Sequence, residues 1–198
     1  IENMNIDNYN KLLKDSRFWN QIPSISILIV HIDALLIEPI DFTFFNYDLV
    51  GAPWAMKKHI STNFYTYSED LSYEMYNQWE TINFCTAIPN DIPFGNGGLS
   101  IRNTKKMALI CDSVPSNKSE PEDYYFSKAL TLMRNNSNLP TINEARRFAC
   151  ETDYFHSIGS HASHLYLKAE EQARIYERHF IHLISLVNAS SKNNNKSN

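Results

Sequence analysis

The feature that most constrains the fold is an apolar run near the N-terminus. Residues 25–30 read Ile-Ser-Ile-Leu-Ile-Val, and most of these side chains are β-branched. A run with so little polar alternation is typical of a strand buried on both faces of a mixed or parallel sheet. Polar residues interrupt the longer segment 25–40. No stretch reaches the roughly 18 apolar residues of a membrane span, so no membrane span is predicted.

The composition indicates one globular domain. The chain has 198 residues, of which 43% are hydrophobic and 20% are charged, and its net charge is −4. This hydrophobic share is enough for a core, and the acidic balance argues against nucleic acid as a partner. The three cysteines are far apart, which argues against a disulfide scaffold and favours a reducing compartment. The chain begins at Ile1, without a methionine or a signal peptide, so we expect it to be a fragment.

Apolar spacing and turn residues predict the elements. Helices are expected over 9–19, 103–110, 121–134, 142–151 and 165–187, and strands over 25–30, 35–37, 47–50 and 99–102. Residues 56–91 predict a long loop with a helix around Tyr73–Trp79, 156–164 a further loop, and 188–198 a disordered tail. Strands mixed with helices predict a single α/β domain over 1–187.

Three of these helices carry start signals. Asn103 can cap the helix that follows it, because an Asn side chain accepts a hydrogen bond from the free backbone amides of a first turn. Ser119 with Glu122, and Thr141 with Glu144, have the spacing of capping boxes.

Four positions could carry chemistry. Asp33 follows the buried strand, at the position where open α/β sheets place ligands. A carboxylate at this position could bind a divalent cation, or it could simply be a surface residue at the end of the strand. Segment 95–98 reads Gly-Asn-Gly-Gly and predicts a tight turn, either at a ligand or in a plain hairpin.

The other two positions lie later in the chain. Asp123 opens a helix whose dipole is expected to lower its pKa and keep it ionised as a base, with a surface Asp as the alternative. His156, His161 and His164 are dense enough for one of them to be a metal ligand and the others bystanders.

The order of these parts resembles that of GT-A glycosyltransferases. More closely, the chain resembles an uncharacterised family of glycosyltransferase-like domains from giant viruses, fungi and bacteria. The resemblance runs over about residues 9–164. It is carried by the segments 18–19, 29–36, 47–54, 95–102, 121–126, 145–151 and 155–161, with Gly-Ala-Pro-Trp and Gly-Asn-Gly-Gly-Leu-Ser as the most specific blocks. It implies a GT-A-like mixed sheet flanked by helices.

The resemblance also implies a metal-dependent transfer of a sugar from a nucleotide-sugar, with a UDP-sugar as the expected donor. Asp33 corresponds to the surviving acid of an Asp-X-Asp motif that holds Mn²⁺ or Mg²⁺, and His31 stands in place of the first acid. His161 corresponds to the C-terminal histidine that completes the metal or diphosphate site.

The remaining site residues follow from the same resemblance. Asn96, Gly97 and Gly98 correspond to a glycine loop beside the donor and acceptor, and Trp54 offers either an aromatic face for a sugar ring or a core side chain. Asp123 corresponds to the base that deprotonates the acceptor hydroxyl. Glu122 either grips the acceptor or only caps the helix, so Glu122→Gln and Asp123→Asn are expected to change stability little.

The chain is therefore predicted to be a virus-encoded glycosyltransferase that acts on a glycan or protein acceptor in the host cytoplasm, the virus factory or the virion. Only 32 residues precede Asp33, so part of the nucleotide-binding half is expected to be missing. The helix over 165–187 is expected to pack on the sheet or to form a homo-oligomer. The alternatives are a catalytically degenerate binding module and a metal-dependent hydrolase.

Overall fold

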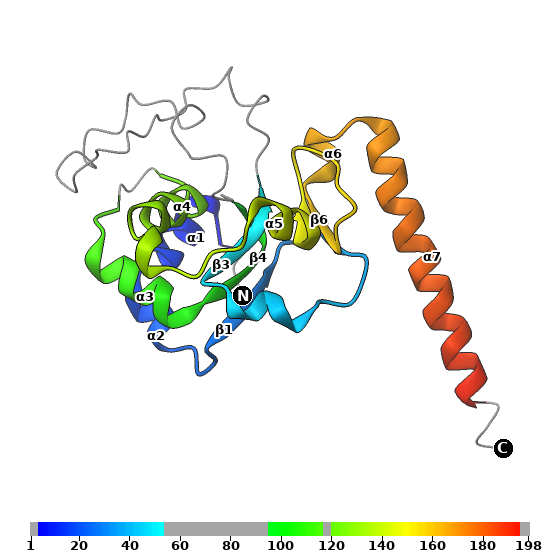
Figure 1. The fold of residues 1–198 in the computed structure, drawn as a ribbon, viewed down its shortest axis with the longest axis horizontal. Coiled ribbons are helices and arrows are strands. Elements are labelled where there is room, and N and C mark those ends of the chain that lie inside the picture. Colours follow the sequence, from blue (N-terminus) through cyan, green and yellow to red (C-terminus); the bar gives the residue numbers. More distant parts are fainter. Residues whose placement is uncertain (1–3, 54–94, 117–119, 195–198) are drawn as a thin grey trace.

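The computed structural model describes residues 4–53, 95–116 and 120–194, and these form a mixed α/β fold (Figure 1). In chain order the elements are α1 (Ile6–Leu13), α2 (Ser16–Asn20), β1 (Ser26–Val30), β2 (Ala34–Leu36), η1 (Phe42–Asn46), β3 (Leu49–Pro53), β4 (Gly95–Asn103), α3 (Thr104–Ser113), α4 (Glu122–Leu132), η4 (Arg134–Asn136), α5 (Ile142–Phe148), β5 (Ala149–Cys150), β6 (Gly159–His161), α6 (Ser163–Tyr166) and α7 (Ala169–Asn194). The predicted α/β class is confirmed.

Two small sheets organise the fold. The first has the order β1-β4-β3 and is antiparallel throughout. The second has the order β2-β6-β5, in which β2 pairs antiparallel with β6 and β5 pairs parallel with β6. The prediction that the strand over 25–30 lies in a mixed or parallel sheet is therefore wrong, because β1 is an antiparallel edge strand and is only half-buried.

The apolar run in β1 has a different cause. One hydrophobic cluster, around Trp19 and Phe126, packs on one face of the first sheet, and a second cluster, around Phe148, packs on the other. Ile27 contacts the first cluster and Leu28 contacts the second. Because both faces are covered, successive residues of this strand are apolar even at the edge of the sheet.

Local capping explains most helix boundaries. The predicted helix over 9–19 is two helices, because the Asp15 side chain accepts a 2.9 Å hydrogen bond from the Arg17 amide and so begins α2. Asn103 caps α3 as predicted. The capping box of Thr141 and Glu144 is also confirmed, although α5 ends at Phe148 because the next two residues form β5.

The predicted glycine turn is wrong. Residues 95–98 are the first part of β4, and every described glycine has an ordinary φ. The predicted loop over 156–164 likewise contains β6 and part of α6. The expected long loop, with its helix at Tyr73–Trp79, and Trp54 lie outside the described residues.

The long C-terminal helix begins later and ends later than predicted. The first residues of the predicted helix belong to the separate short helix α6. Helix α7 begins after it, because the Glu171 carboxylate accepts a 2.9 Å hydrogen bond from the Lys168 amide. Helix α7 then continues past Val187 to Asn194, within the segment expected to be a tail. None of the helices in the described part of the chain combines the length and apolar character that spanning a membrane requires.

Among the described residues, the contacts of α7 with the rest of the fold lie near its beginning. Ile175 is fully buried in a third cluster with Ile37, Cys150 and Leu167. Arg178 donates a 2.5 Å bond to Glu38 and a 2.9 Å bond to the Ser157 carbonyl. Beyond these contacts the helix projects from the body, and the side chains of Phe180, Ile181, Leu183 and Ile184 are exposed, so the expected packing on the sheet is absent there (Figure 1).

This packing predicts that the two ends of α7 differ in their contribution to stability. Ile175→Ala should lower the free energy of unfolding by about 2–4 kcal/mol, because the cavity left behind adds to the lost burial. Ile184→Ala on the exposed part of the same helix should change it by less than about 0.5 kcal/mol. Urea denaturation of the two variants tests this, and equal losses would contradict it.

Candidate functional site

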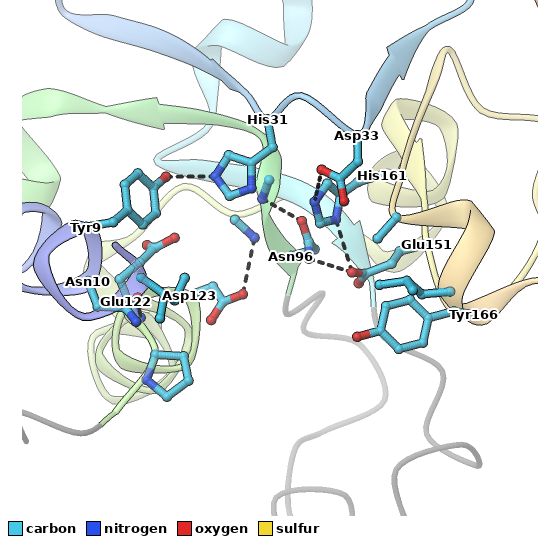
Figure 2. A pocket seen from close by; sticks show the side chains of 16 residues that line it. Tyr9, Asn10, His31, Asp33, Asn96, Glu122, Asp123, Glu151, His161 and Tyr166 are labelled. Carbon is cyan, nitrogen blue, oxygen red and sulfur yellow. Dashed lines mark hydrogen bonds and ion pairs between the residues drawn. The ribbon is translucent and has the colours of Figure 1, made fainter. Parts of the chain in front are cut away.

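The polar candidates converge on one pocket of about 340 Å³ (Figure 2). Its wall is formed by α1, the turn between β1 and β2, the start of β4, the start of α4, and the segment from β6 into α6. Elements far apart in the sequence thus contribute side chains to a single concave site, as in most ligand-binding sites.

Asp33 and His161 lie side by side in this pocket. The Asp33 Oδ1 atom is 3.2 Å from His161 Nε2, which confirms the predicted proximity. Strand pairing explains it, because Ala34 of β2 is opposite His161 of β6, and the Ala162 amide donates a 3.3 Å bond to the Asp33 carbonyl. Ala162 itself adopts a left-handed conformation with φ 46°, which turns the chain sharply from β6 into α6.

His31 completes a cluster of three potential metal ligands. One ligand atom from each of His31, Asp33 and His161 lies within 4.8 Å of the others. Burial, together with the neighbouring His161, lowers the pKa of His31, which favours the neutral imidazole with a free nitrogen lone pair. The Nε2 atom of His31 lies 3.0 Å from the Tyr9 hydroxyl. From the sequence, His31 was expected only to stand in place of an acid.

Glu151 and Asn96 are connected to this cluster by hydrogen bonds through His161. Glu151 Oε1 is 3.1 Å from His161 Nδ1 and accepts a 2.6 Å bond from Asn96 Nδ2. The Asn96 side-chain oxygen accepts a 2.5 Å bond from the Gly98 amide. Asn96 was predicted to bind the donor or acceptor, and here its amide group holds Glu151. Glu151 was not singled out, because it follows the short strand β5 and no local pattern marks it.

The two inner glycines of β4 are required by side chains that cross the strand. A Cβ atom on Gly98 would lie 2.1 Å from His161 Nε2, and one on Gly97 would lie 2.2 Å from Glu122 Oε1. Both distances are shorter than any van der Waals contact. The glycine segment is therefore explained by close packing of site residues on the strand, not by a turn.

A buried ion pair fixes the opposite wall. Arg102 of β4 is completely buried, and its guanidinium contacts both carboxylate oxygens of Glu122, one of them at 2.9 Å and the other even more closely. Its Nε atom donates a 3.0 Å bond to the Ser100 hydroxyl, which donates a 2.9 Å bond to the Gly97 carbonyl. Glu122 therefore holds Arg102. Its predicted partner in a capping box, Ser119, lies outside the described residues.

Asp123 follows this pair and faces the pocket (Figure 2). Its pKa is raised to about 7, first because burial removes the carboxylate from water and second because the charge of Glu122 repels its own. The prediction that the helix dipole lowers this pKa is wrong, because desolvation outweighs the dipole. The Gly97 amide lies 3.4 Å from Asp123 Oδ2.

The other candidates have different positions. His156 and His164 are exposed and are not among the three clustered ligands, which agrees with the expectation that two of the three late histidines are bystanders. Trp54, the predicted sugar-stacking residue, is outside the described chain. Two aromatic residues that the sequence analysis did not select, Tyr9 and Tyr166, line the pocket.

The family to which the chain belongs has no assigned activity. Residues 2–165 match the model of the family described as "Protein of unknown function (DUF5672)", and the chain belongs to that family. The match covers the described residues that line the pocket except Tyr166, and it ends before α7. No curated protein and no solved structure matches the chain.

The buried ion pair of Arg102 and Glu122 predicts that a nearly isosteric substitution of Glu122 strongly lowers the stability of the fold. Glu122→Gln should lower the free energy of unfolding by about 3 kcal/mol, because it leaves the charge of Arg102 buried without its partner. This differs from the sequence-based expectation that Glu122→Gln changes stability little. Glu177→Gln, at an exposed position of α7, is the control and should change stability by less than about 0.5 kcal/mol. Chemical denaturation measures both variants, and a Glu122→Gln protein as stable as the control would contradict the structural role.

The raised pKa of Asp123 predicts a pH dependence of stability. The folded chain keeps a proton on Asp123 up to about pH 7, whereas the unfolded chain releases it near pH 3.8. The free energy of unfolding that comes from this group is thus fully present below pH 3.8 and falls as the pH rises to about 7. Asp123→Asn removes the ionisation, so its stability relative to the parent should rise by about 2.5–3 kcal/mol between pH 5 and 8. Urea denaturation of both proteins at several pH values tests this, and a constant difference would contradict it.

Proposed function

We propose that this member of the family is a metal-dependent transferase that moves a sugar from a nucleotide-sugar, with a UDP-sugar as the expected donor, to a hydroxyl of a glycan or protein. One observation carries the proposal. A cluster of potential metal ligands and a carboxylate with a pKa of about 7 line the same pocket from different sides (Figure 2). In the transfer of a sugar from a diphosphate to a hydroxyl, a cation assists the leaving diphosphate and a base deprotonates the hydroxyl, so the two must lie in one pocket.

Asp33 and His161 are the residues that would hold the cation, Mn²⁺ or Mg²⁺. They offer a carboxylate oxygen and an imidazole nitrogen that already lie 3.2 Å apart. A bound divalent cation supplies neutralisation of the diphosphate leaving group. The close packing of His161 on Gly98 supports the proposal, because it holds the ring in one position in the pocket.

Asp123 is suited to be the general base. A base works best when its pKa is near the operating pH, and Asp123 meets that condition at neutrality. In the proposed reaction its carboxylate accepts the proton of the acceptor hydroxyl. The acceptor oxygen forms a bond to the anomeric carbon, and the bond from that carbon to the diphosphate oxygen breaks. Glu122 does not compete for this role, since both of its oxygens contact Arg102.

The shape of the pocket favours a sugar ring. Tyr166, at the end of α6, lines it and is 43% exposed, and an aromatic ring in this position suits stacking against the apolar face of a sugar. The volume of about 340 Å³ is at the lower end of the range for ligand pockets. Only α1, α2 and β1 precede Asp33 among the described residues, so they contain no βαβ unit for a nucleotide base there.

A metal-dependent hydrolase is the second candidate. The observation that favours it is the presence of two imidazoles with one carboxylate, His31, His161 and Asp33, since three-residue sets of this kind hold the catalytic zinc of hydrolases. In that reaction Asp123 would accept a proton from water in place of an acceptor hydroxyl.

Calorimetric titration with UDP-glucose, with and without Mn²⁺, separates the candidates. Donor binding that requires Mn²⁺ and is lost in Asp33→Ala supports the transferase. Donor binding that is indifferent to Mn²⁺ indicates a binding module without turnover. Absence of donor binding together with Mn²⁺-dependent hydrolysis of nitrophenyl phosphate esters indicates the hydrolase.

The proposed base predicts a specific kinetic effect. Asp123→Asn should reduce turnover about 10²–10⁴-fold while the protein remains folded. In the parent protein kcat/KM should rise with pH up to about 7 and then level off, because the base must lose its proton first. His164→Asn, at an exposed position next to the pocket, is the control and should leave the profile unchanged. Full turnover of Asp123→Asn would remove Asp123 as the base.

A further inference from the structure

We propose that His31, Asp33 and His161 form a three-ligand centre that prefers a first-row transition ion such as Zn²⁺ or Co²⁺ to Mg²⁺, with Glu151 and Tyr9 positioning the two imidazoles. This inference deepens the proposed function, on which it rests for the place of the cation. It assigns His31 as a ligand, selects the class of metal and identifies two positioning residues.

A chain of hydrogen bonds determines which nitrogen of His161 is free. The Gly98 amide can only donate, so the Asn96 atom that it contacts at 2.5 Å is the carbonyl oxygen. The amide nitrogen of Asn96 then donates to Glu151 Oε1 at 2.6 Å. That carboxylate oxygen accepts a second bond, at 3.1 Å, from the Nδ1–H of His161. The lone pair of a neutral His161 is therefore on Nε2, the atom that faces Asp33 (Figure 2).

A positive charge between His161 and Asp33 would stabilise this arrangement. The two ring nitrogens of His161 lie 3.1 and 3.2 Å from two carboxylates. A neutral imidazole has only one N–H, so one of these contacts would otherwise set a lone pair against a carboxylate oxygen. Either a second proton or a metal ion resolves the repulsion. A metal ion bound to Nε2 of His161 and Oδ1 of Asp33 does so with both groups as ligands.

His31 offers the third ligand atom. Its Nε2 atom lies 3.0 Å from the Tyr9 hydroxyl, so we assign the metal to Nδ1, which leaves that contact in place. When Nδ1 binds a metal, Nε2 carries the proton and donates a hydrogen bond to the Tyr9 oxygen. Ligand atoms that are each about 2.1 Å from one ion lie at most about 4.2 Å apart. In a tetrahedral site they lie about 3.4 Å apart, so the widest of the observed separations, which are within 4.8 Å, would shorten by up to about 1.4 Å around the ion.

The chemistry of the ligands determines the class of metal. Mg²⁺ prefers oxygen ligands and retains several waters, whereas imidazole nitrogen favours zinc, cobalt, iron and other transition ions. Two nitrogens and one oxygen leave coordination positions open for substrate or water. Partners on the outer nitrogens, as Glu151 and Tyr9 are here, typically contribute 10–100-fold to metal affinity.

Direct titration with Co²⁺ tests the centre without a nucleotide-sugar, on protein free of added histidine tags. We expect one Co²⁺ per chain, with visible absorption bands that a thousandfold excess of Mg²⁺ leaves in place. His31→Ala should weaken binding at least about 100-fold, and Glu151→Gln and Tyr9→Phe about 10–100-fold. His164→Ala, on the neighbouring helix α6, is the matched control and should bind as the parent does.

Two results would overturn the inference. One is Co²⁺ binding that is unchanged in His31→Ala, and the other is displacement of Co²⁺ by an equal concentration of Mg²⁺. Tyr9→Phe removes a single oxygen, so it remains informative if Glu151→Gln does not fold. Co²⁺ binding with this pattern but without any sugar transfer would contradict the proposed function and still support the metal centre. Sugar transfer supported equally by Mg²⁺, with His31→Ala fully active, would do the reverse.

Discussion

The buried ion pair between Arg102 and Glu122 is the interaction on which the site depends. Arg102 has no exposed surface, and a charge in such a place is tolerated only when it is paired and fully hydrogen-bonded. Glu122, the Ser100 hydroxyl and the Gly97 carbonyl provide those partners. Since Arg102 belongs to β4 and Glu122 begins α4, the pair fixes the start of that helix against the central strand. The next residue, Asp123, is thereby held at the pocket.

The same strand also carries the other half of the site. Gly97 lies under the Glu122 carboxylate and Gly98 under the His161 ring, so adjacent residues of β4 support both walls. Asn96, one residue earlier, holds Glu151 and through it His161. The start of β4 is thus a floor of residues with small or precisely hydrogen-bonded side chains. Larger residues there would separate the groups that the site brings together.

Sequence reasoning succeeded where the cause of a structure is local. The capping box of Thr141 and Glu144 is encoded within four residues, and Asn103 caps the helix that begins at the next residue. It failed where the cause is a distant contact. The glycines looked like a turn because the packing of Glu122 and His161 on them is a tertiary feature.

Glu151 and Tyr9 were missed for a related reason. Their importance comes from the histidines they contact, 10 and 22 residues away in the chain, and neither residue stands in a recognisable motif. The ionisation of Asp123 was also misjudged, since a helix start favours the charged form in isolation, whereas burial and the neighbouring charge of Glu122 favour the neutral form.

The adjacency of Glu122 and Asp123 produces two carboxylates with different properties. Arg102 contacts both oxygens of Glu122, so the charge of Glu122 is compensated and its position is fixed. Burial and the nearby charge of Glu122 raise the pKa of Asp123 to about 7, and they outweigh the opposing charge of Arg102. Neighbouring acids whose environments separate their pKa values are a common basis for assigning acid and base roles. One glutamate therefore stabilises the fold, and the aspartate beside it keeps a proton that it can exchange near neutral pH.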